Sequence, residues 1–595
     1  MSRHRRQYHI EVSNRHSVSK WHWQWQWQWQ QCYLVPPSTT MPSNMPEELE
    51  MEGIDHALER LNQRRWWIWS VFILASSPGL FNAYHIMVSL FFASIPPYWC
   101  RIPQLVDTHW TNDQIRNISS PTGLTGSSCS MISWNYTYLA TMDYKSALQF
   151  VASHPKPSES PCTQFMYDEE VPYSSTVSQW DLVCDNLPKK SNIQSSIAIG
   201  KFVGGFLFGF IADKYGRKSS FVLASLTYII MGPLAAFSPS YWLFIVARFF
   251  LGIAGSGCYE SAYTILTEVA SKDRRAVLGC VYNMSYPIGY MTLSLIALVF
   301  PTWRSLQMAI SLPMLLLCIH CWFLPESPRW LLTQGRQIEA WAVIKNVDKS
   351  VVPPLSEDIT NVQREEGPFV PLHKRIFDGF RKLFGLFSTA ELCRRICICY
   401  LTWFIAALSY YVLALNADNF SSNRYIYLAL SGLVEAPSYV LPLIILSWFG
   451  RKFTGALLFL VSGVSLIAIL FISAENKLMI LIVALLGRFA DSAVFAVIIL
   501  HTSELFPTSN RNTAIGTSLA VSQLGSIFAP YVVDIMGRYA WYIPSTLCGG
   551  LAVFSALLTL LLPETQNKPL MDTIQDLKKA PKRDHVSIRN CCNFS

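Results

Sequence analysis

The sequence predicts an all-α membrane protein in which twelve transmembrane helices form two six-helix bundles of similar construction. The chain has 595 residues, of which only 14% are charged and 20 are tryptophan. Its mean hydropathy is +0.26, which excludes an ordinary soluble protein. A helix needs roughly 20 apolar residues to cross the hydrocarbon core of a bilayer. Twelve apolar runs of about this length are present: 66–94, 193–212, 219–237, 240–264, 276–300, 303–324, 396–416, 424–447, 453–473, 477–501, 513–535 and 539–562.

The two halves of the chain carry the same landmarks in the same order, six apolar runs to each half. Gly216-Arg217-Lys218 recurs as Gly450-Arg451-Lys452, and Leu324-Pro325-Glu326 recurs as Leu562-Pro563-Glu564. Two further pairs repeat at nearly the same offset: Thr267-Glu268 with Arg275 as Ser503-Glu504 with Arg511, and Arg248 as Arg488. Such repeats are a common construction in membrane transporters.

Basic residues flank the apolar runs on one side of the predicted membrane. The net charge is +8, and we attribute it to topology rather than to nucleic-acid binding, since the positive-inside rule makes this side cytoplasmic. Both termini are then cytoplasmic, and the polar, basic first 65 residues do not resemble a cleavable signal peptide. The predicted organisation is a cytoplasmic tail (1–65), a first bundle (66–324) with an extracellular loop domain (95–192), a cytoplasmic central loop (325–395), a second bundle (396–562) and a cytoplasmic tail (563–595).

The predicted extracellular segments carry cysteines and glycosylation acceptors. Four cysteines lie in or beside the first outer loop, and they allow three pairings among which sequence does not choose: Cys100, Cys129, Cys162 and Cys184. The Asn-X-Ser/Thr acceptors predicted to face outward are Asn117, Asn135 and Asn419.

Two segments outside the apolar runs have unusual composition. Residues 21–30 alternate tryptophan with polar residues, which favours a low-complexity tail over a strand. Residues 372–384 place basic and apolar residues at helical spacing. This pattern fits a helix on the inner leaflet or a solvated linker helix.

Glu435 is the sharpest candidate for a binding site. An ionisable group at the centre of a membrane helix costs about 2.5–3.5 kcal/mol on insertion scales and needs a partner. Glu435 lies near the middle of the run 424–447, and the following Pro437 frees a backbone carbonyl, as suits a cavity wall. A structural carboxylate bonded to a neighbouring helix is the alternative.

These motifs resemble the major facilitator superfamily, and more closely its organic cation, anion and zwitterion branch, solute carrier family twenty-two. The resemblance rests on the segments 209–218 (GFIADKYGRK), 248–275, 325–331 (PESPRWL) and 503–512 (SELFPTSNRN). It covers about residues 60–570 and leaves out both tails.

The resemblance implies two bundles that rock around a central cavity and expose it alternately to each side. On this basis we expect a set of cytoplasmic charges to pair when the inner gate is shut and to separate when it opens. Anchoring of helix ends is the alternative role. The set comprises Asp213, Arg217, Glu268 and Arg275 in the first half, and Arg451, Glu504 and Arg511 in the second.

The resemblance also places side chains in the cavity. Glu435 matches the acid of cation- and carnitine-type members, and four residues match polar or aromatic cavity positions: Trp403, Tyr410, Tyr259 and Asn283. Gln523 stands where cation-selective members carry Asp and where anion- and carnitine-type members carry Arg. Because Gln523 is uncharged, we expect Glu435 alone to supply a formal charge, with Lys201 as a partner for a carboxylate or for Glu435 itself. His85, His320, Asp491 and His501 are further intramembrane polar groups, expected to be helix-to-helix bonds or proton-coupling sites.

We therefore expect a plasma-membrane carrier of small organic cations or zwitterions. The substrate is an amine-bearing small molecule, the other partner is the lipid bilayer, and a coupling ion is possible. The sequence offers no catalytic set, metal-ligand spacing or cofactor motif, so we expect neither an enzyme nor a nucleic-acid binder. An organic anion carrier is the alternative within the fold, and a non-transporting receptor or scaffold is the alternative of another class.

Overall fold

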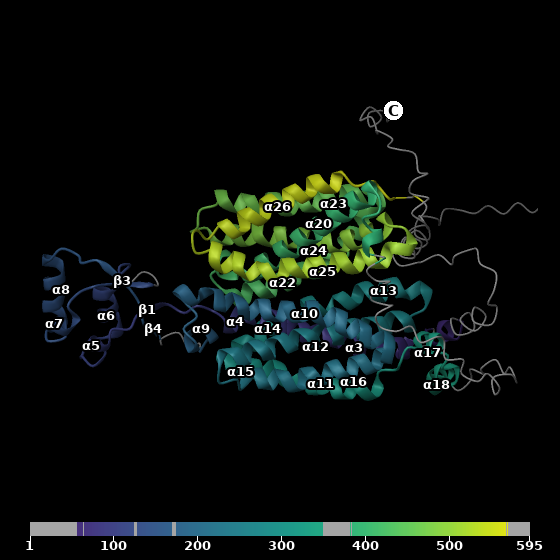
Figure 1. Ribbon diagram of the computed structural model, residues 1–595, viewed down its shortest axis with the longest axis horizontal. Coiled ribbons are helices and arrows are strands. Elements are labelled where there is room, and N and C mark those ends of the chain that lie inside the picture. Colours follow the sequence, from purple (N-terminus) through teal and green to yellow (C-terminus); the bar gives the residue numbers. More distant parts are fainter. Residues whose placement is uncertain are drawn as a thin grey trace, which may run out of the picture.

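The structure is a computed structural model that describes residues 56–62, 65–123, 128–168, 174–348, 381, 383–566 and 568. Two helical bundles lie side by side, with a small domain projecting from one end and two short helices at the other (Figure 1). We call these the domain end and the opposite end. The expectations for residues 21–30, for 372–380 and for most of both tails lie outside the described residues.

The first bundle contains six spanning segments. In chain order they are α3 (Arg65–Met87) with α4 (Ser89–Phe92), α10 (Leu187–Tyr215), α11 (Arg217–Ala236), α12 (Tyr241–Val269), the pair α13 (Lys272–Asn283) and α14 (Ser285–Val299), and the series α15 (Trp303–Ser311), η2 (Leu312–Leu316) and α16 (Leu317–Phe323). Two short helices follow at the opposite end, α17 (Pro328–Thr333) and α18 (Gln337–Val347).

The second bundle repeats this plan. Its elements are α20 (Ala390–Leu415) with the short α21 (Ala417–Phe420), α22 (Arg424–Ser438), α23 (Leu441–Ala468) with η4 (Ile469–Phe471), α24 (Lys477–Leu505), α25 (Thr508–Tyr531) with the π-helical turn η5 (Val532–Met536), and α26 (Ile543–Leu560). The predicted two-bundle helical fold is confirmed.

Ten helices of the described chain are long and apolar enough to cross a membrane by length and composition. The two remaining predicted spans are interrupted helices. The fifth breaks at Met284 between α13 and α14. The eighth breaks after Pro437 and continues into the start of α23, where Gly450, with φ of 78°, ends it before the ninth span begins. A proline removes a backbone hydrogen bond and so interrupts a helix.

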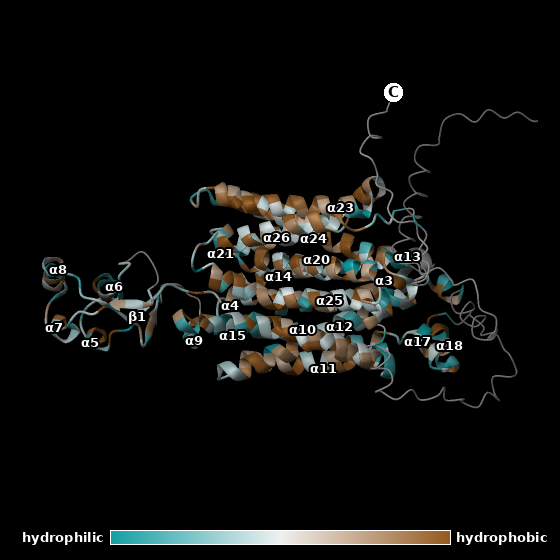
Figure 2. Ribbon diagram, turned by 45° about the horizontal axis from the view of Figure 1, so that its top comes forward, coloured by the Kyte–Doolittle hydropathy of each residue, from teal (hydrophilic) through white to brown (hydrophobic). Residues whose placement is uncertain are grey.

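Small residues let helices approach closely within each bundle. A Cβ added to Gly200 of α10 would lie 2.1 Å from the carbonyl oxygen of Phe249, and one added to Gly252 of α12 would lie 2.2 Å from that of Ile197. This close packing of small residues is typical of helix pairs in membranes. Hydrophobic residues make up much of both bundles (Figure 2). Many of the large ones are exposed on the bundle surface, as contact with lipid requires, for example Phe206, Trp242 and Leu298.

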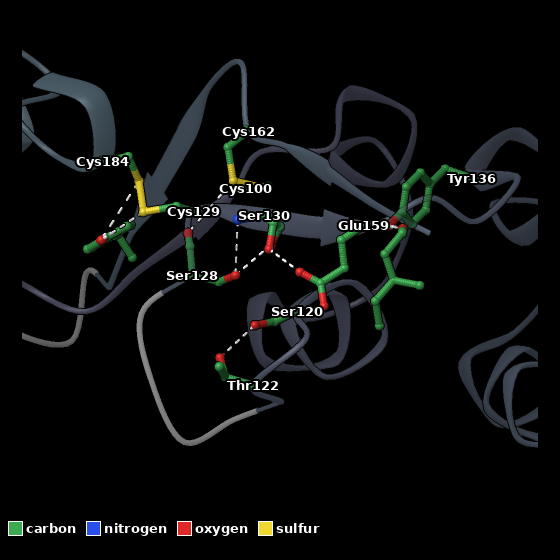
Figure 3. The surroundings of a disulfide bond; sticks show 12 residues. Cys100, Ser120, Thr122, Ser128, Cys129, Ser130, Tyr136, Glu159, Cys162 and Cys184 are labelled. Carbon is green, nitrogen blue, oxygen red and sulfur yellow. Dashed lines mark hydrogen bonds between the residues drawn. A yellow bond between two sulfur atoms is a disulfide. The ribbon is translucent and has the colours of Figure 1, made fainter. Parts of the chain in front are cut away.

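The projecting domain is held by two disulfides and two small sheets (Figure 3). The disulfides are Cys100–Cys162 and Cys129–Cys184, one of the three pairings left open by the sequence. Strand β1 (Tyr98–Cys100) pairs antiparallel with β4 (Phe165–Tyr167), and β2 (Ser130–Ile132) pairs with β3 (Glu159–Pro161). Short helices α5 (Pro103–Val106), α6 (Asn112–Ser119), α7 (Tyr136–Leu139) and α8 (Tyr144–Ser153) complete the domain, and α9 (Thr176–Gln179) leads back to α10.

Candidate functional site

Glu435 is fully buried and forms an ion pair. The Nη2 atom of Arg488, on α24, lies 2.8 Å from Oε2 of Glu435, and both side chains are buried. The hydroxyls of Tyr410 and Tyr439 donate to Oε1 at 2.9 and 3.0 Å. The expectation of a lone charged acid is therefore wrong, because a long-range partner on another helix compensates the charge.

The guanidinium of Arg488 lies against an acid and two aromatic rings. Its central carbon lies 4.3 Å from the centre of the Tyr410 ring and 5.7 Å from that of Tyr290. The Tyr290 and Tyr410 hydroxyls are 2.5 Å apart, which joins α14 of the first bundle to α20 of the second. Ring faces attract cations, so this niche has the chemistry of a cation site, occupied here by an arginine of the protein.

Asp491 lies one turn beyond Arg488 on α24 and is fully buried. Neither of its carboxylate oxygens has a hydrogen-bond partner among the described residues, and the Nε atom of Arg488 also lacks one. Two acids and one base thus share this buried region. The sequence marked Asp491 as polar and Arg488 only as a repeat landmark. The pair could have been predicted, because an arginine within a membrane helix needs an acidic partner.

Lys201 is associated with a second acid, Glu260, and not with Glu435. Lys201 lies on α10 and interacts electrostatically with Glu260 of α12, which also bonds Ser256. A Cβ on Gly205 would lie 3.4 Å from Oε1 of Glu260, so the carboxylate lies against α10. Glu260 is exposed, unlike Glu435. Sequence reasoning missed Glu260, although an acid in the apolar run 240–264 was a visible signal.

The other predicted cavity residues occupy different environments. The Tyr259 hydroxyl donates to Oδ1 of Asn283 at 2.7 Å, which links α12 to α13. Trp403 is fully buried, and its indole N–H donates to Thr502 at 3.1 Å. Gln523 is half-buried on α25 and accepts a hydrogen bond from Ser526 at 3.5 Å. Tyr410 therefore lies at the Glu435 niche, whereas Trp403 packs between helices.

The repeated glycines at the opposite end each hold a carboxylate. Gly216 has φ of 105°, and the carboxylate of Glu326 accepts the backbone N–H of Arg217 and of Lys218. Gly450 has φ of 78°, and Glu564 accepts the corresponding N–H groups of Arg451 and Lys452 at 3.0 Å each.

The two carboxylates nevertheless differ in acidity. Burial raises the pKa of Glu326 above its usual range and outweighs the backbone hydrogen bonds that it accepts. Burial also acts to raise the pKa of Glu564. At Glu564, however, the hydrogen bonds from the backbone N–H groups outweigh the effect of burial, and the pKa is lowered. The donors are Gln566, Arg451, Thr565 and Lys452. Hydrogen bonds to the ionised form favour that form.

Among the described residues, five of the seven predicted gate charges form ion pairs, and each pair lies within one bundle. Arg217 lies 3.3 Å from Glu268 and 3.2 Å from the exposed Asp213, and Arg451 lies 3.0 Å from Glu504. Two nitrogens of Arg275, Nε and Nη2, are buried without a hydrogen-bond partner among the described residues. Arg511 donates to Thr508 on its own helix at 3.3 Å.

Contacts at the domain end join the two bundles, and sequence analysis missed them. Lys190 of α10 lies 2.7 Å from Asp534 of η5, and Ser191 donates to the same carboxylate at 2.7 Å. The Tyr531 hydroxyl donates to Asn192 at 2.6 Å. The sequence does not predict such contacts, because a polar residue near the end of a membrane helix is common and does not indicate a partner on another helix.

Open space adjoins the same face of α10 near its other end. Gly209 lies five helical turns from Ser191, and no atom lies within 4 Å of a Cβ built on it. The same holds for Gly516 of α25. The bundles are thus bonded at the domain end and have open space beside α10 and α25 toward the opposite end. No group of three or more potential metal ligands occurs among the described residues.

Comparison with known proteins decides the family. Residues 125–577 match the model of the sugar (and other) transporter family. Solute carrier family 22 member 1 of Bos taurus is 30% identical over 91% of this chain and 96% of its own. The chain belongs to solute carrier family 22.

Other relatives are named for organic cations and for organic anions. An organic cation transporter protein of Drosophila melanogaster is 29% identical over 88% of the chain and 94% of its own length. Organic anion transporter 3 of Sus scrofa is 30% identical over 85% and 90%. The partially occluded inward-open xylose transporter XylE from E. coli superimposes with a TM-score of 0.55 at 17% identity, over 84% of this chain and 99% of its own. The protein is a multi-pass membrane transporter of the solute carrier 22 type and not an enzyme.

Proposed function

We propose that this transporter carries small amine-bearing solutes, organic cations or zwitterions, across the plasma membrane by alternating access. One observation carries the proposal: the guanidinium of Arg488 rests on the Glu435 carboxylate and over the Tyr410 ring. A side-chain cation thus occupies a niche of acid and aromatic groups at the junction of the bundles. A solute ammonium, like that guanidinium, is stabilised by a carboxylate and by the faces of aromatic rings.

The niche is closed in this structure, so solute binding requires the Glu435–Arg488 pair to open in another state of the cycle. An ammonium that replaced Arg488 would keep Glu435 compensated and would regain the ring contacts. Each such ring contact is worth about 0.5–2 kcal/mol. An uncharged solute would leave Glu435 buried without a counter-charge, which is strongly unfavourable.

A second pair of charged residues would let the site bind both charges of a zwitterion. Glu260 and Lys201 supply one acid and one base between α12 and α10. Gln523, without charge, lies on α25, whose outer end is bonded to α10. A solute with both an ammonium and a carboxylate would find an acidic partner for the first and a basic partner for the second in this arrangement.

The sidedness follows from the disulfides and the basic residues. Disulfides persist in oxidising surroundings, so the domain with Cys100–Cys162 and Cys129–Cys184 is extracellular. The opposite end carries the Gly-Arg-Lys repeats, which the positive-inside rule places in the cytoplasm together with both termini. With the bundles bonded at the outer end, this state faces inward.

Organic anion transport is the second candidate. If the ion pair opens, Arg488 is exposed as well as Glu435, and the carboxylate of a solute could form an ion pair with Arg488. The relative named organic anion transporter 3 supports this possibility. The two candidates differ in which member of the pair is essential for uptake.

Uptake in cells with voltage recording distinguishes them. Cells expressing the protein receive labelled tetraethylammonium, carnitine, β-alanine and a dicarboxylate, and Glu435→Gln is compared at matched surface expression. The amine proposal predicts saturable uptake of one or more amines that Glu435→Gln abolishes. Dicarboxylate uptake that survives Glu435→Gln supports the anion candidate, and absence of flux for every solute supports a non-transporting receptor.

A further inference from the structure

We propose that Asp491 is a proton-binding site that exchanges its proton for the solute ammonium at Glu435. The inference rests on the proposed function and adds a coupling ion to it. Asp491 lies midway along α24, 14 residues from either end of the helix. It is fully buried, and both carboxylate oxygens lack a hydrogen-bond partner in the described chain.

Charge balance requires a proton on Asp491 in this state. The buried region holds two carboxyl groups, Glu435 and Asp491, and one guanidinium, Arg488, which is committed to Glu435 at 2.8 Å. An ionised Asp491 would be a buried charge without compensation, which proteins avoid by neutralising the group. The empty, inward-facing state is then a neutral cluster of Glu435⁻, Arg488⁺ and Asp491–H.

Arg488 can serve either acid in turn. Residues three apart on a helix are neighbours on its surface, and Arg488 and Asp491 interact electrostatically. The Nε–H of Arg488 has no acceptor in the described chain, so a donor and an acceptor stand unpaired beside each other. A small rotation of the guanidinium away from Glu435 would bring it to Asp491.

Binding of an ammonium solute at Glu435 drives this transfer. The bond between Glu435 and Arg488 breaks, Glu435 pairs with the ammonium, Arg488 pairs with Asp491, and the Asp491 O–H bond breaks, with the proton passing to water on the open side. The loaded cluster is Glu435⁻, ammonium, Arg488⁺ and Asp491⁻, again neutral. One organic cation is therefore carried in one direction for each proton carried in the other, and the transporter is a cation–proton exchanger.

Other ionisable groups around Asp491 leave this account intact. Glu435 acts on it from α22 and the thiol of Cys548 from α26. The Tyr410 hydroxyl of α20 is bonded to Glu435. The charged residues of the helices packed against α24 lie at helix ends or at the kink of α23. They are Arg451 and Lys452 directly after Gly450 on α23, Glu391, Arg394 and Arg395 in the first turns of α20, Arg424 at the start of α22, Arg511 in the first turn of α25 and Asp418 on α21.

The test uses the full-length protein in liposomes with tetraethylammonium and choline, whose permanent charge excludes trapping of a neutral base. With an interior one pH unit more acidic, one-for-one exchange predicts accumulation up to roughly tenfold. A potassium diffusion potential should add nothing, because the exchange moves no net charge. Asp491→Asn should abolish the response to the pH gradient, while Asp491→Glu retains it. Ser492→Ala, at a buried neighbour whose hydroxyl is also unpartnered, serves as the control.

The outcomes separate the two proposals. Uptake that ignores the pH gradient, or a gradient response that survives Asp491→Asn, overturns the proton site and leaves the amine carrier standing. Absence of uptake of tetraethylammonium, choline, carnitine and β-alanine under every gradient contradicts the amine carrier and the exchange together. Infrared spectroscopy gives an independent readout. The wild type should show the carbonyl band of a protonated carboxyl that Asp491→Asn lacks, and an identical spectrum for the two proteins contradicts the proposal.

Discussion

The Nη2 atom of Arg488 lies 2.8 Å from Oε2 of Glu435, and both side chains are fully buried. This pair makes Arg488 a helix-to-helix connector and also an occupant of the niche in which we expect the solute ammonium. It joins α24 to α22, and Tyr410 connects the same carboxylate to Tyr290 in the first bundle. Opening of the pair would therefore affect the junction between bundles directly.

The first prediction concerns the stability of this pair. Arg488→Met leaves Glu435 buried without a counter-charge, which costs about 3–5 kcal/mol. We expect a clear loss of thermal stability in detergent, measured by fluorescence-detected size exclusion after heating. The double variant Glu435→Gln with Arg488→Met should recover most of the loss. A double variant no more stable than Arg488→Met alone would show that the pair is not the cause.

The second prediction concerns the repeated glycines. A Cβ on Gly216 would lie 2.4 Å from Oε2 of Glu326, and one on Gly450 would lie 2.7 Å from Oε2 of Glu564. The positive φ adds about 1–2 kcal/mol for any L side chain. Gly216→Ala and Gly450→Ala should each lower thermal stability and surface expression. Gly550→Ala in α26, where nothing lies within 4 Å, is the matched control and should match the wild type or exceed it.

A third prediction tests the extracellular closure. The side chain of Asp534 accepts from Lys190 and from Ser191 at 2.7 Å each. Asp534→Asn removes the ion pair and should shift the population toward the outward-facing state. A cysteine at Ser195, which is buried where it donates to Ile527, should then react faster with a membrane-impermeant maleimide added outside. Asp185→Asn, which removes an exposed charge on the same side, should leave the rate unchanged, and equal rates in both variants contradict the role of the pair.

The fourth prediction ranks the glycosylation acceptors. Asn135 is exposed, whereas the amide of Asn117 donates to the Tyr144 hydroxyl at 2.9 Å and that of Asn419 donates to Asn416 at 2.6 Å. The folded domain has room for a glycan at Asn135. Asn135→Gln should therefore increase gel mobility as glycosidase treatment does, and Asn117→Gln should have a smaller effect. Unchanged mobility of Asn135→Gln would exclude this position.

Much of the fold could be predicted because the bilayer imposes a strong constraint on composition. Apolar runs locate the spanning helices, and the repeated Gly-Arg-Lys motif reveals the second bundle. The ends were less accurate: α10 begins at Leu187, whereas its predicted run begins at residue 193. The helix extends beyond the apolar run by a polar turn that contains Lys189 and Lys190. The prediction missed this turn because a polar turn outside the membrane carries no hydropathy signal.

The site was predicted less well because its decisive contacts join distant parts of the chain. Glu435 was identified from depth alone, but its partner is 53 residues away on another helix. Lys201 and Glu260 likewise come close enough to interact electrostatically only once α10 packs on α12. The four cysteines could be assigned to one domain, yet their pairing depends on two small sheets whose strands have only three residues each. Sequence gives the inventory of charged groups, and packing decides which of them meet.

The most direct test of the amine site is equilibrium binding to the purified protein. Labelled tetraethylammonium and choline are titrated against the wild type, Glu435→Gln and the conservative Glu435→Asp, with folding verified by size exclusion. The account predicts saturable binding to the wild type, a loss of at least tenfold in affinity for Glu435→Gln, and partial retention for Glu435→Asp. Equal affinity of the wild type and a folded Glu435→Gln for the amines would contradict it.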